Sequence, residues 1–361
     1  RKLHAADLEK GITLALQSND KAVLRNIQRQ NIKLESYKAL QVRFNEAHVP
    51  VYSELILGLP GETFETWRRG VEEMLSAGLK NQLFIYLCQV FPNTEMAEPE
   101  YQKRFGIVTR RIELNEIHGA IRSDALVTEY EDVIVTTDAM PLPMWREMVL
   151  FSWLTMVLHS LKVAFFVMLW LSDRHGIKIT EFIESVLRTG RSWAGLGREL
   201  REFDSQIERL LGGAGRGRRV EGHAAIYWDE EEASFIRISE NLGAFYEELL
   251  DFVAEFLLIR GRAVDEDELR EVMLYQRLRI PTADDEAVLV VRFERNIPEY
   301  FDRLLTSAPI ALRAECQTAT IHARRFPDKK RFAVETLMWG RKSGTIMTRV
   351  EWFGCAEREA A

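Results

Sequence analysis

The stretch from Val51 to Thr63, VYSELILGLPGET, decides the fold of this chain. Its apolar first half predicts a buried strand, and the Gly and Pro residues that follow predict a turn with the carboxylate of Glu62 just beyond it. Apolar and aromatic residues at helical spacing then predict a helix from about Glu65 to Ala77. This is a strand–loop–helix unit of an α/β protein, in which ligands bind where strands end and glycine lets them approach the backbone.

Two further strands are predicted, one on each side of this unit. Gly11 to Ser18 form the preceding strand, and Gln82 to Val90 form the following one. Helices from Lys21 to about Arg29, capped by Asp20, and from Leu34 to His48 connect the first strand to the second. This alternation at short spacing indicates parallel strands joined by right-handed crossovers. The predicted fold class is therefore α/β.

Residues 141–211 are predicted to be strongly helical. Within them, Phe151 to Leu171 is an apolar run long enough to cross a membrane, but His159, Ser160 and Lys162 interrupt its middle. A Lys at the centre of a bilayer costs about 2.5–3.5 kcal/mol. A buried helix or helix pair is therefore favoured over a membrane span, and membrane contact is open but not favoured.

The rest of the chain is predicted to contain a linker, a second helical block and a small C-terminal module. Gly212 to Arg219 is Gly-rich and predicts a flexible linker, and Glu231 to about Arg279 predicts helices with a buried aromatic stripe. The module is predicted to be α+β, with a helix at Glu299–Leu305, a hairpin loop at Gly340–Gly344 and strands at Val288–Phe293, Thr318–Arg324, Arg331–Trp339 and Thr345–Phe353. The predicted divisions are a half-barrel at 1–125, a helical region at 126–211, the linker at 212–220, a second helical region at 221–285 and the module at 286–361.

Charge and cysteine content narrow the class of protein. The 48 Lys and Arg residues against 55 Asp and Glu residues give a net charge of −7, which does not favour a nucleic-acid partner. The three cysteines, Cys88, Cys316 and Cys355, lie far apart, which predicts a reducing, cytoplasmic compartment without structural disulfides. The histidines show no metal-ligand spacing and the serines no Gly-x-Ser-x-Gly motif, so neither a zinc site nor a hydrolase is predicted.

Three segments resemble the radical S-adenosylmethionine (radical SAM) superfamily, most closely its branch with an N-terminal cobalamin-binding domain. ITLALQSNDKAVLRNIQR (residues 12–29), ELILGLPGETFETW (54–67) and FIYLCQVFPNTEMA (84–97) are similar to the fourth, fifth and sixth barrel strands with the segments after them. Residues 140–275 resemble the helical tail of cobalamin-type members, and Asn93 stands where the sixth strand usually ends in Pro-Gly-Thr. The resemblance implies a partial radical-SAM (β/α) barrel, made of the last three strands, before the helical region and the module.

The family's Cys-x3-Cys-x2-Cys motif, which holds a [4Fe-4S] cluster, is absent from this chain. We expect the chain to be the C-terminal portion of a longer protein, with the cobalamin domain and the cluster loop upstream, and to be inactive alone. The alternative is a half-barrel that never had a cluster. An upstream reading frame with a cysteine triad would decide between them.

The resemblance implies that the first surviving strand and its helix contact SAM. Gln17 would contact the ribose or the amino-acid portion, and Arg29 would pair with the SAM carboxylate, for which a planar guanidinium is suited. From the residues alone, Gln17 could equally cap the next helix, and Arg29 could interact with the helix dipole. Both interpretations stay open at this point.

The other two strands would supply the remaining contacts. Glu54 would bind the ribose hydroxyls, and an acid inside an apolar strand is costly without a partner. Ile56 would pack on adenine and Gly58 would leave room for it, although barrel core and a tight turn explain them as well. The resemblance also implies that Gln89 and Val90 present backbone to the adenine edge.

The function implied by the resemblance is methyl transfer to an unreactive carbon or phosphorus centre through a 5′-deoxyadenosyl radical. Cofactors would be SAM, the cluster and cobalamin, and partners would be a small-molecule substrate and a reductant such as flavodoxin or ferredoxin. A cyclisation or rearrangement by the same radical chemistry is the first alternative. The second is a degenerate, non-catalytic half-barrel whose helical tail docks a partner.

Overall fold

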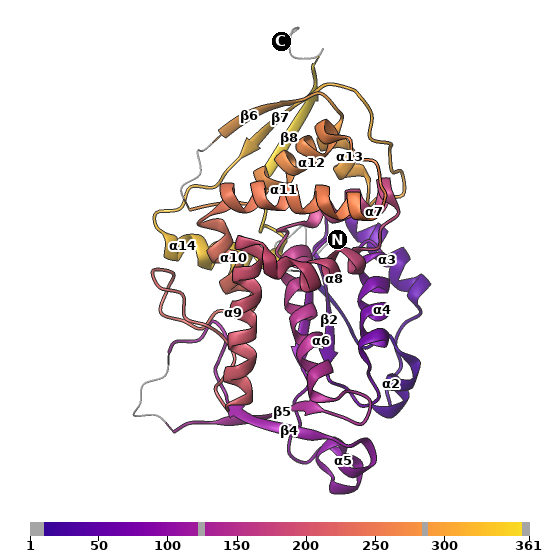
Figure 1. The fold of residues 1–361 in the computed structure, drawn as a ribbon, viewed down its shortest axis with the longest axis vertical. Helices are drawn as coiled ribbons and strands as arrows, with labels where there is room; N and C mark the ends of the chain where they lie inside the picture. The colour runs from indigo at the N-terminus through magenta and orange to yellow at the C-terminus, as the bar shows by residue number, and fades with distance from the viewer. Residues whose placement is uncertain (1–10, 122–126, 284–287, 356–361) are drawn as a thin grey trace.

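The computed structural model describes residues 11–121, 127–283 and 288–355, and it is an α/β protein (Figure 1). A parallel sheet of three strands in the order β1-β2-β3 is made of β1 (Ile12–Gln17), β2 (Val51–Leu57) and β3 (Leu83–Leu87). The three predicted strands and their parallel direction are therefore confirmed. Whether these strands are half of a barrel stays a prediction.

The helices between these strands follow from local sequence signals. They are α2 (Lys21–Asn26), α3 (Leu34–Glu46) and α4 (Phe64–Leu75). Asp20 caps α2 by accepting a hydrogen bond from the backbone N–H of Ala22 at 2.8 Å. Thr63 and Thr66 form a reciprocal capping box at the start of α4. The predicted helix to Arg29 is shorter than expected, because Ile27 already leaves helical geometry.

The two faces of β2 differ, and this difference positions the site described below. Ser53, Leu55 and Leu57 are buried, whereas the alternating Tyr52, Glu54 and Ile56 are only half-buried. The hydroxyl of Tyr37 on α3 lies 2.7 Å from that of Ser53, so the buried face packs against the connecting helices. The half-buried face is left to line a cavity.

A helical block packs beside the sheet and contains most of the remaining chain. Its members are α6 (Leu142–Thr155), the π-helical turn Met156–Ser160, α7 (Phe165–His175), α8 (Ile179–Thr189), the 3₁₀ turn Gly190–Ser192, α9 (Ala194–Leu211), α10 (Glu230–Ser239), α11 (Leu242–Ile259) and α12 (Glu266–Leu278). The predicted aromatic stripe is confirmed, since Phe235, Phe245, Phe252 and Phe256 are buried. Buried apolar residues form a cluster that extends from Leu16 in β1 to Ile346 near the C-terminal sheet.

The apolar run Phe151–Leu171 forms a bent helix pair, as expected. α6 with its π-helical turn and α7 meet at 91°, with Lys162 in a positive-φ conformation between them. The ammonium of Lys162 donates hydrogen bonds to the backbone carbonyls of Lys80 and Asn81. Within the described ranges no single helix is long and apolar enough to cross a membrane; this bent pair meets that criterion only as a pair, by length and composition.

Two small antiparallel sheets lie at opposite ends of the molecule (Figure 1). β4 (Val108–Glu113) pairs with β5 (Tyr130–Thr136), and β6 (Val288–Phe293), β7 (Gln317–His322) and β8 (Arg349–Gly354) form the second sheet in that order. The remaining short elements are the 3₁₀ turn Glu95–Ala97, α5 (Pro99–Phe105), α13 (Ile297–Arg303), α14 (Lys329–Ala333), the π-helical turn Val334–Trp339 and α15 (Gly340–Ser343). The β-branched run Val133–Thr137 predicts the strand β5, which is confirmed, as are the predicted strands at Val288–Phe293, Thr318–Arg324 and Thr345–Phe353, which are β6, β7 and β8.

Three local predictions are wrong. The polar stretch Tyr101–Leu126 predicts helix and loop, but it contains the strand β4, in which only Ile112 is buried and no alternation marks the strand. Arg331–Trp339 was expected to be a strand but is helical, because Asp328 caps the N-terminus of α14 and the buried residues recur at helical spacing. Gly340–Gly344 was expected to be a hairpin loop but continues as α15.

The segment Gly212–Arg219, predicted to be a flexible linker, makes ordered contacts. The backbone of Arg218 pairs with that of Trp228, and the side chain of Arg218 lies 3.4 Å from the carboxylate of Glu230. The prediction fails because the glycines let the backbone pass close to neighbouring residues, and the arginines find buried carboxylates. The division of the chain into domains stays a prediction.

A disulfide joins Cys316 to Cys355, so the predicted absence of structural disulfides is wrong. Cys316 precedes β7 and Cys355 follows β8, and the antiparallel register places Gln317 opposite Gly354. The two cysteines are 39 residues apart, a separation that hides the pairing in the sequence. The cytoplasmic location stays a prediction.

Removing this disulfide is expected to lower the free energy of unfolding by about 2–4 kcal/mol, because the reduced chain gains conformational entropy when unfolded. The comparison is between the parent and the double variant Cys316→Ser, Cys355→Ser, in urea without reductant. Adding dithiothreitol should bring the parent to the stability of the variant. Equal stability of the two proteins in the absence of reductant would contradict the disulfide.

Candidate functional site

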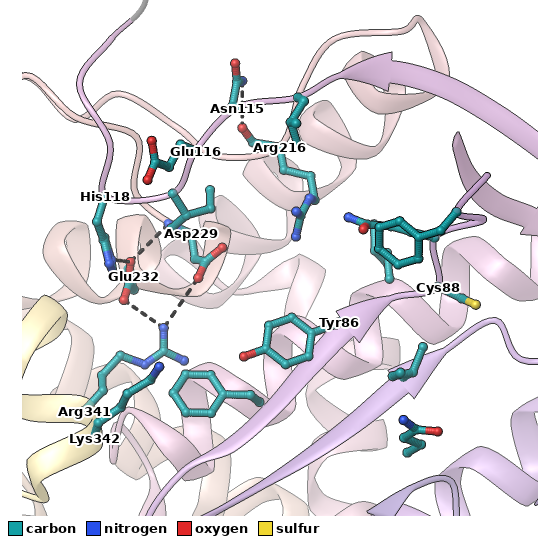
Figure 2. A pocket seen from close by; sticks show the side chains of 18 of the residues that line it. Tyr86, Cys88, Asn115, Glu116, His118, Arg216, Asp229, Glu232, Arg341 and Lys342 are labelled. Atoms are coloured by element: carbon teal, nitrogen blue, oxygen red, sulfur yellow. Dashed lines mark hydrogen bonds and ion pairs between the residues drawn. The ribbon is translucent and has the colours of Figure 1, made fainter. Parts of the chain in front are cut away.

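A cavity of about 970 Å³ lies against the half-buried face of the parallel sheet (Figure 2). Its main lining comes from the strand ends, the segment 114–118, the start of α10 and the C-terminal residues 337–342, and Ile27, Phe91, Met96, Glu129 and Arg216 complete it. Figure 2 shows Tyr86 and Cys88 on the strand side, with His118, Asp229 and Arg216 across the cavity from them. Parts of the chain more than 200 residues apart therefore meet at one site.

Three of the seven predicted site residues line this cavity. They are Gln17 at the end of β1, Ile56 in β2 and Gln89 just after β3. Gln17 has a φ of 62° and lies at a register shift between β1 and β2, so the strand ends abruptly there. The side-chain amide of Gln89 donates a hydrogen bond to the carboxylate of Glu131. The structure thus brings together one predicted residue from each strand.

The other four predicted residues are not among those that line the cavity. The Arg29 guanidinium donates a hydrogen bond to the backbone carbonyl of Ala15 at 2.8 Å, and thereby ties its segment to β1. Glu54 is half-buried on the same face of β2 as Ile56. Gly58 has a φ of 99°, which favours glycine, and the Val90 N–H donates to the carbonyl of Asp132 at 2.8 Å. Their proposed contacts with SAM stay predictions.

The site also contains a buried charge cluster that sequence reasoning missed. The guanidinium of Arg341 donates hydrogen bonds to Glu231 at 2.9 Å and to Glu232 at 2.8 Å, and it lies 3.8 Å from Asp229. The side chains of Arg341, Glu231 and Glu232 are each no more than 3% exposed. The cluster, which we call the Arg341 cluster, therefore fastens the C-terminal residues to α10 beneath the cavity.

His118 continues this cluster towards the cavity. Its ring nitrogen Nε2 lies 2.7 Å from the Glu232 carboxylate, and its side chain is 23% exposed and lines the cavity. Burial alone would lower the pKa of His118, but the hydrogen bond and the charge of Glu232 outweigh burial and raise it. Burial would likewise raise the pKa of Glu232, but Arg341 and His118 hold it well below its usual range. The arrangement presents an imidazole that readily carries a proton.

Two aromatic side chains join the cluster to the strands. The Arg341 guanidinium carbon lies 4.6 Å from the ring centroid of Phe84, which stacks with Tyr86 at 6.2 Å. Burial raises the pKa of Tyr86, with a further contribution from the charge of Glu54, so its hydroxyl stays protonated. The one visible signal for this cluster was the run of four acids at 229–232 directly before a buried helical stripe. Its partner Arg341 lies more than 100 residues away, where no local pattern marks it.

The turn after β2 carries a buried carboxyl group, Glu62. It is 1% exposed and accepts hydrogen bonds from the hydroxyls of Ser18 at 2.9 Å and Thr66 at 2.8 Å. Ser18 directly follows β1, so Glu62 links the ends of two neighbouring strands. Burial raises the pKa of Glu62 from its ordinary value of 4.5 to about 7.

Glu62 is therefore expected to make stability depend on pH. Because the folded-state pKa lies above the unfolded one, the folded state holds the proton more tightly, and stability falls as the pH rises from about 4.5 through 7. At 1.36 kcal/mol per pKa unit, the full loss is about 3–4 kcal/mol, and the part that falls between pH 5 and pH 8 is about 2–3 kcal/mol. Glu62→Gln lacks this titration, so between pH 5 and pH 8 it should gain this amount relative to the parent in urea unfolding. A stability difference that does not change with pH would contradict the shifted pKa.

The described residues do not provide a set of metal ligands. No three His, Cys, Asp or Glu side chains gather as a metal site in residues 11–121, 127–283 and 288–355. Cys88 is buried next to Met96, burial raises its pKa to about 12, and the other two cysteines are joined to each other. These residues do not fit a [4Fe-4S] cluster. The cavity, with its apolar strand face and polar rim, does fit an organic ligand of the size of SAM.

Comparison with known proteins gives two informative relatives. TokK of Streptomyces tokunonensis, described as a cobalamin-dependent radical SAM methyltransferase, is 35% identical over 198 residues, which are 54% of this chain and 28% of TokK. The 2-(S-pantetheinyl)-carbapenam-3-carboxylate methyltransferase of Streptantibioticus cattleyicolor is 28% identical over 353 residues, which cover 91% of this chain and 51% of that protein. The matches thus span about half or less of the relatives' length. No family model matches the chain.

Proposed function

This chain is related to the cobalamin-binding branch of the radical SAM superfamily, and we propose that it supplies the SAM- and substrate-binding part of a methyltransferase. Its matches cover only 28% and 51% of the two relatives, and the resemblance of its strands to the last three strands of the barrel supports a C-terminal portion of a longer enzyme. On this proposal, catalysis needs the intact protein, and the chain is inactive alone.

The observation that carries the proposal is the convergence of Gln17, Ile56 and Gln89 on one cavity. Each was assigned to SAM from a different strand by its sequence motif. Ile56 offers an apolar surface for adenine, while the amides of Gln17 and Gln89 offer hydrogen bonds to the ribose or the amino-acid portion. The pairing of Gln89 with Glu131 holds that amide in place.

The side of the cavity across from the strands is proposed to bind the substrate. His118 faces the cavity there. Its ring pairs with the carboxylate of Glu232, which in turn pairs with the guanidinium of Arg341. A protonated imidazole donates a charge-assisted hydrogen bond to a substrate oxygen. One relative is named for a carbapenam carboxylate substrate. We therefore propose a small molecule that carries a carboxylate, oriented by His118, as the substrate class.

The cofactors would be held elsewhere in the intact protein. A bound [4Fe-4S] cluster would supply one-electron chemistry, and cobalamin would carry the methyl group. A flavodoxin or ferredoxin would supply the reducing equivalents. This chain's own share is to bind SAM, orient the substrate and exclude water from the cavity. The methyl group would go to an unreactive carbon or phosphorus centre after a 5′-deoxyadenosyl radical removes a hydrogen atom.

The test uses the intact protein, reconstituted with cluster and cobalamin under anaerobic, reducing conditions. With SAM that carries a trideuterated methyl group, mass spectrometry should detect 5′-deoxyadenosine and a product heavier by that methyl group. A protein that contains both cofactors yet releases no 5′-deoxyadenosine would contradict radical chemistry. Release of 5′-deoxyadenosine with transfer of no methyl group to any carboxylate-bearing candidate would contradict methyl transfer.

A further inference from the structure

A second site lies away from the large cavity, around Lys80 and Arg279. Two smaller cavities, of about 250 and 210 Å³, share Lys80, Arg279 and Met347 as lining residues. Neither Lys80 nor Arg279 lines the 970 Å³ cavity. Lys80 precedes β3, and Arg279 directly follows α12. We call this the Lys80–Arg279 site.

The site carries an excess of positive charge. Lys162 is buried beside it, and its ammonium is hydrogen-bonded to the backbone carbonyl of Lys80 itself. Arg279 lowers the pKa of Lys80, after the larger effect of burial, and both lower the pKa of Lys162. The three cations are thus close enough to repel one another. In the part of the chain that the structure describes, none of them has an acidic group within ion-pair distance.

The acidic group that faces the site, Asp302, acts on Lys80 from beyond ion-pair distance, and its charge affects the pKa of Lys80 more than the charge of Arg279 does. Asp302 on α13 lines the smaller cavity and raises the pKa of Lys80, but it is exposed and forms no ion pair with Lys80 or Arg279 among the described residues. His48 lines the larger of the two cavities and adds no negative charge. Half-buried cations without a counterion are costly, because burial removes hydration that nothing replaces.

Arg279 is held in a fixed orientation. Its Nε donates to the carbonyl of Thr348 at 3.2 Å, and one terminal nitrogen donates to the hydroxyl of Tyr275 at 2.7 Å. Its guanidinium carbon lies 5.2 Å from the ring centroid of Phe166. The second terminal nitrogen makes no hydrogen bond to a described residue that would occupy it. A guanidinium fixed on one side in this way is pre-organised to receive a ligand on the other.

The walls of the smaller cavity are aromatic. Phe166, Tyr275, Phe301 and Trp352 line it together with Lys80 and Arg279. The rings of Tyr275 and Phe301 stack at 5.4 Å, which gives a flat apolar surface next to the two cations. A ligand with an anionic end and a flat apolar body would meet complementary groups at both ends.

We propose that Lys80 and Arg279 bind an oxyanion, a phosphate or carboxylate group, carried by a small molecule whose apolar body packs against Phe166, Tyr275 and Phe301. The free terminal nitrogen of Arg279 donates to the anion, and the Lys80 ammonium supplies a second, flexible donor. This site is separate from the proposed SAM cavity. Its occupant is recognised without SAM, cluster or cobalamin.

The test is calorimetric titration of the intact protein at constant ionic strength with inorganic phosphate, phenyl phosphate, benzoate and, as a neutral control, phenol. Saturable binding of phenyl phosphate or benzoate, tighter than inorganic phosphate and absent for phenol, is expected. The relative affinities of phenyl phosphate and benzoate show whether the site prefers a phosphate or a carboxylate group. Lack of saturable binding for every anion would overturn the proposal.

Substitutions of Lys80 and Arg279 test whether these two cations bind the anion. Lys80→Met is expected to weaken anion binding at least tenfold, and Arg279→Lys, which keeps the charge but loses the planar guanidinium, should weaken it less. Lys38→Met, at an exposed position on α3, is the matched control and should bind as the parent does. Unchanged binding in Lys80→Met would overturn the proposal.

Thermal unfolding gives an independent measurement. Without added anion, Lys80→Met should melt no lower than the parent, because the substitution removes an uncompensated cation. With phenyl phosphate, only proteins that keep Lys80 should gain melting temperature. Two results would overturn the proposal. One is a loss of stability in Lys80→Met without ligand, and the other is a structure of the intact protein in which one of its own carboxylate side chains lies between Lys80 and Arg279. Neither calorimetry nor thermal unfolding depends on methyl transfer, so this proposal and the proposed function can fail separately.

Discussion

Replacing Arg341 with Met is expected to lower the free energy of unfolding by about 3–5 kcal/mol, as is typical when one partner of a buried ion pair is removed. The substitution keeps most of the aliphatic packing but leaves Glu231 and Glu232, both almost fully buried, without their counterion. Chemical denaturation at pH 7 measures the effect. Because the positive charge of Arg341 by itself lowers the pKa of His118, the variant should also raise the pKa of that imidazole further, which NMR titration of the ring can follow.

Two controls separate this effect from a general loss of charge. Arg270→Met removes an Arg that is 63% exposed and paired with Glu266 one helical turn away, and should cost no more than about 0.5 kcal/mol. Adding Glu231→Gln and Glu232→Gln to Arg341→Met should restore part of the lost stability, because neutral side chains no longer need the cation. A loss below about 1 kcal/mol in Arg341→Met would show that the cluster is not a buried ion network.

Replacing Ile56 with Trp is expected to abolish most SAM binding while the fold is retained. Ile56 is half-buried near the C-terminal end of β2 and faces the 970 Å³ cavity, so the larger ring can enter open space that adenine would otherwise occupy. We expect the dissociation constant for SAM in the intact protein to rise at least tenfold, which corresponds to about 1.4 kcal/mol. Equilibrium dialysis with labelled SAM measures it.

Val288→Trp is the matched control, because Val288 is 52% exposed on the edge strand β6, away from the cavity. It should bind SAM as the parent does. Unchanged affinity in Ile56→Trp, with an intact circular dichroism spectrum, would mean that the half-buried face of β2 does not contact the ligand. The assignment of Ile56, and with it the proposed adenine position, would then be wrong.

Features set by local sequence could be predicted. The Asp20 cap, the strand β2 and the turn after Leu57 each depend on residues a few positions apart, and each appears as expected, although one face of β2 is only half-buried. Gln17, Ile56 and Gln89 line one cavity because parallel strands bring their ends to one edge regardless of loop detail, while their contacts with SAM stay predictions.

Features set by distant partners could not be predicted. Cys316 pairs with Cys355 only because β7 and β8 are neighbours, and Arg341 reaches α10 only because residues 329–343 are helical rather than a strand and hairpin. β4 has polar residues on both faces and only Ile112 in the core, so its pairing with β5 is not marked in its own sequence. In each case the decisive contact lies far along the chain.

The central claim is that the ends of β1, β2 and β3 bind the adenosyl portion of SAM. A crystal structure of the intact protein with SAM, grown without oxygen, tests it most directly. The account predicts adenine against Ile56, with Gln17 and Gln89 within hydrogen-bonding distance of the ligand. SAM bound elsewhere in the protein, with the face of Ile56 free of ligand, would contradict it.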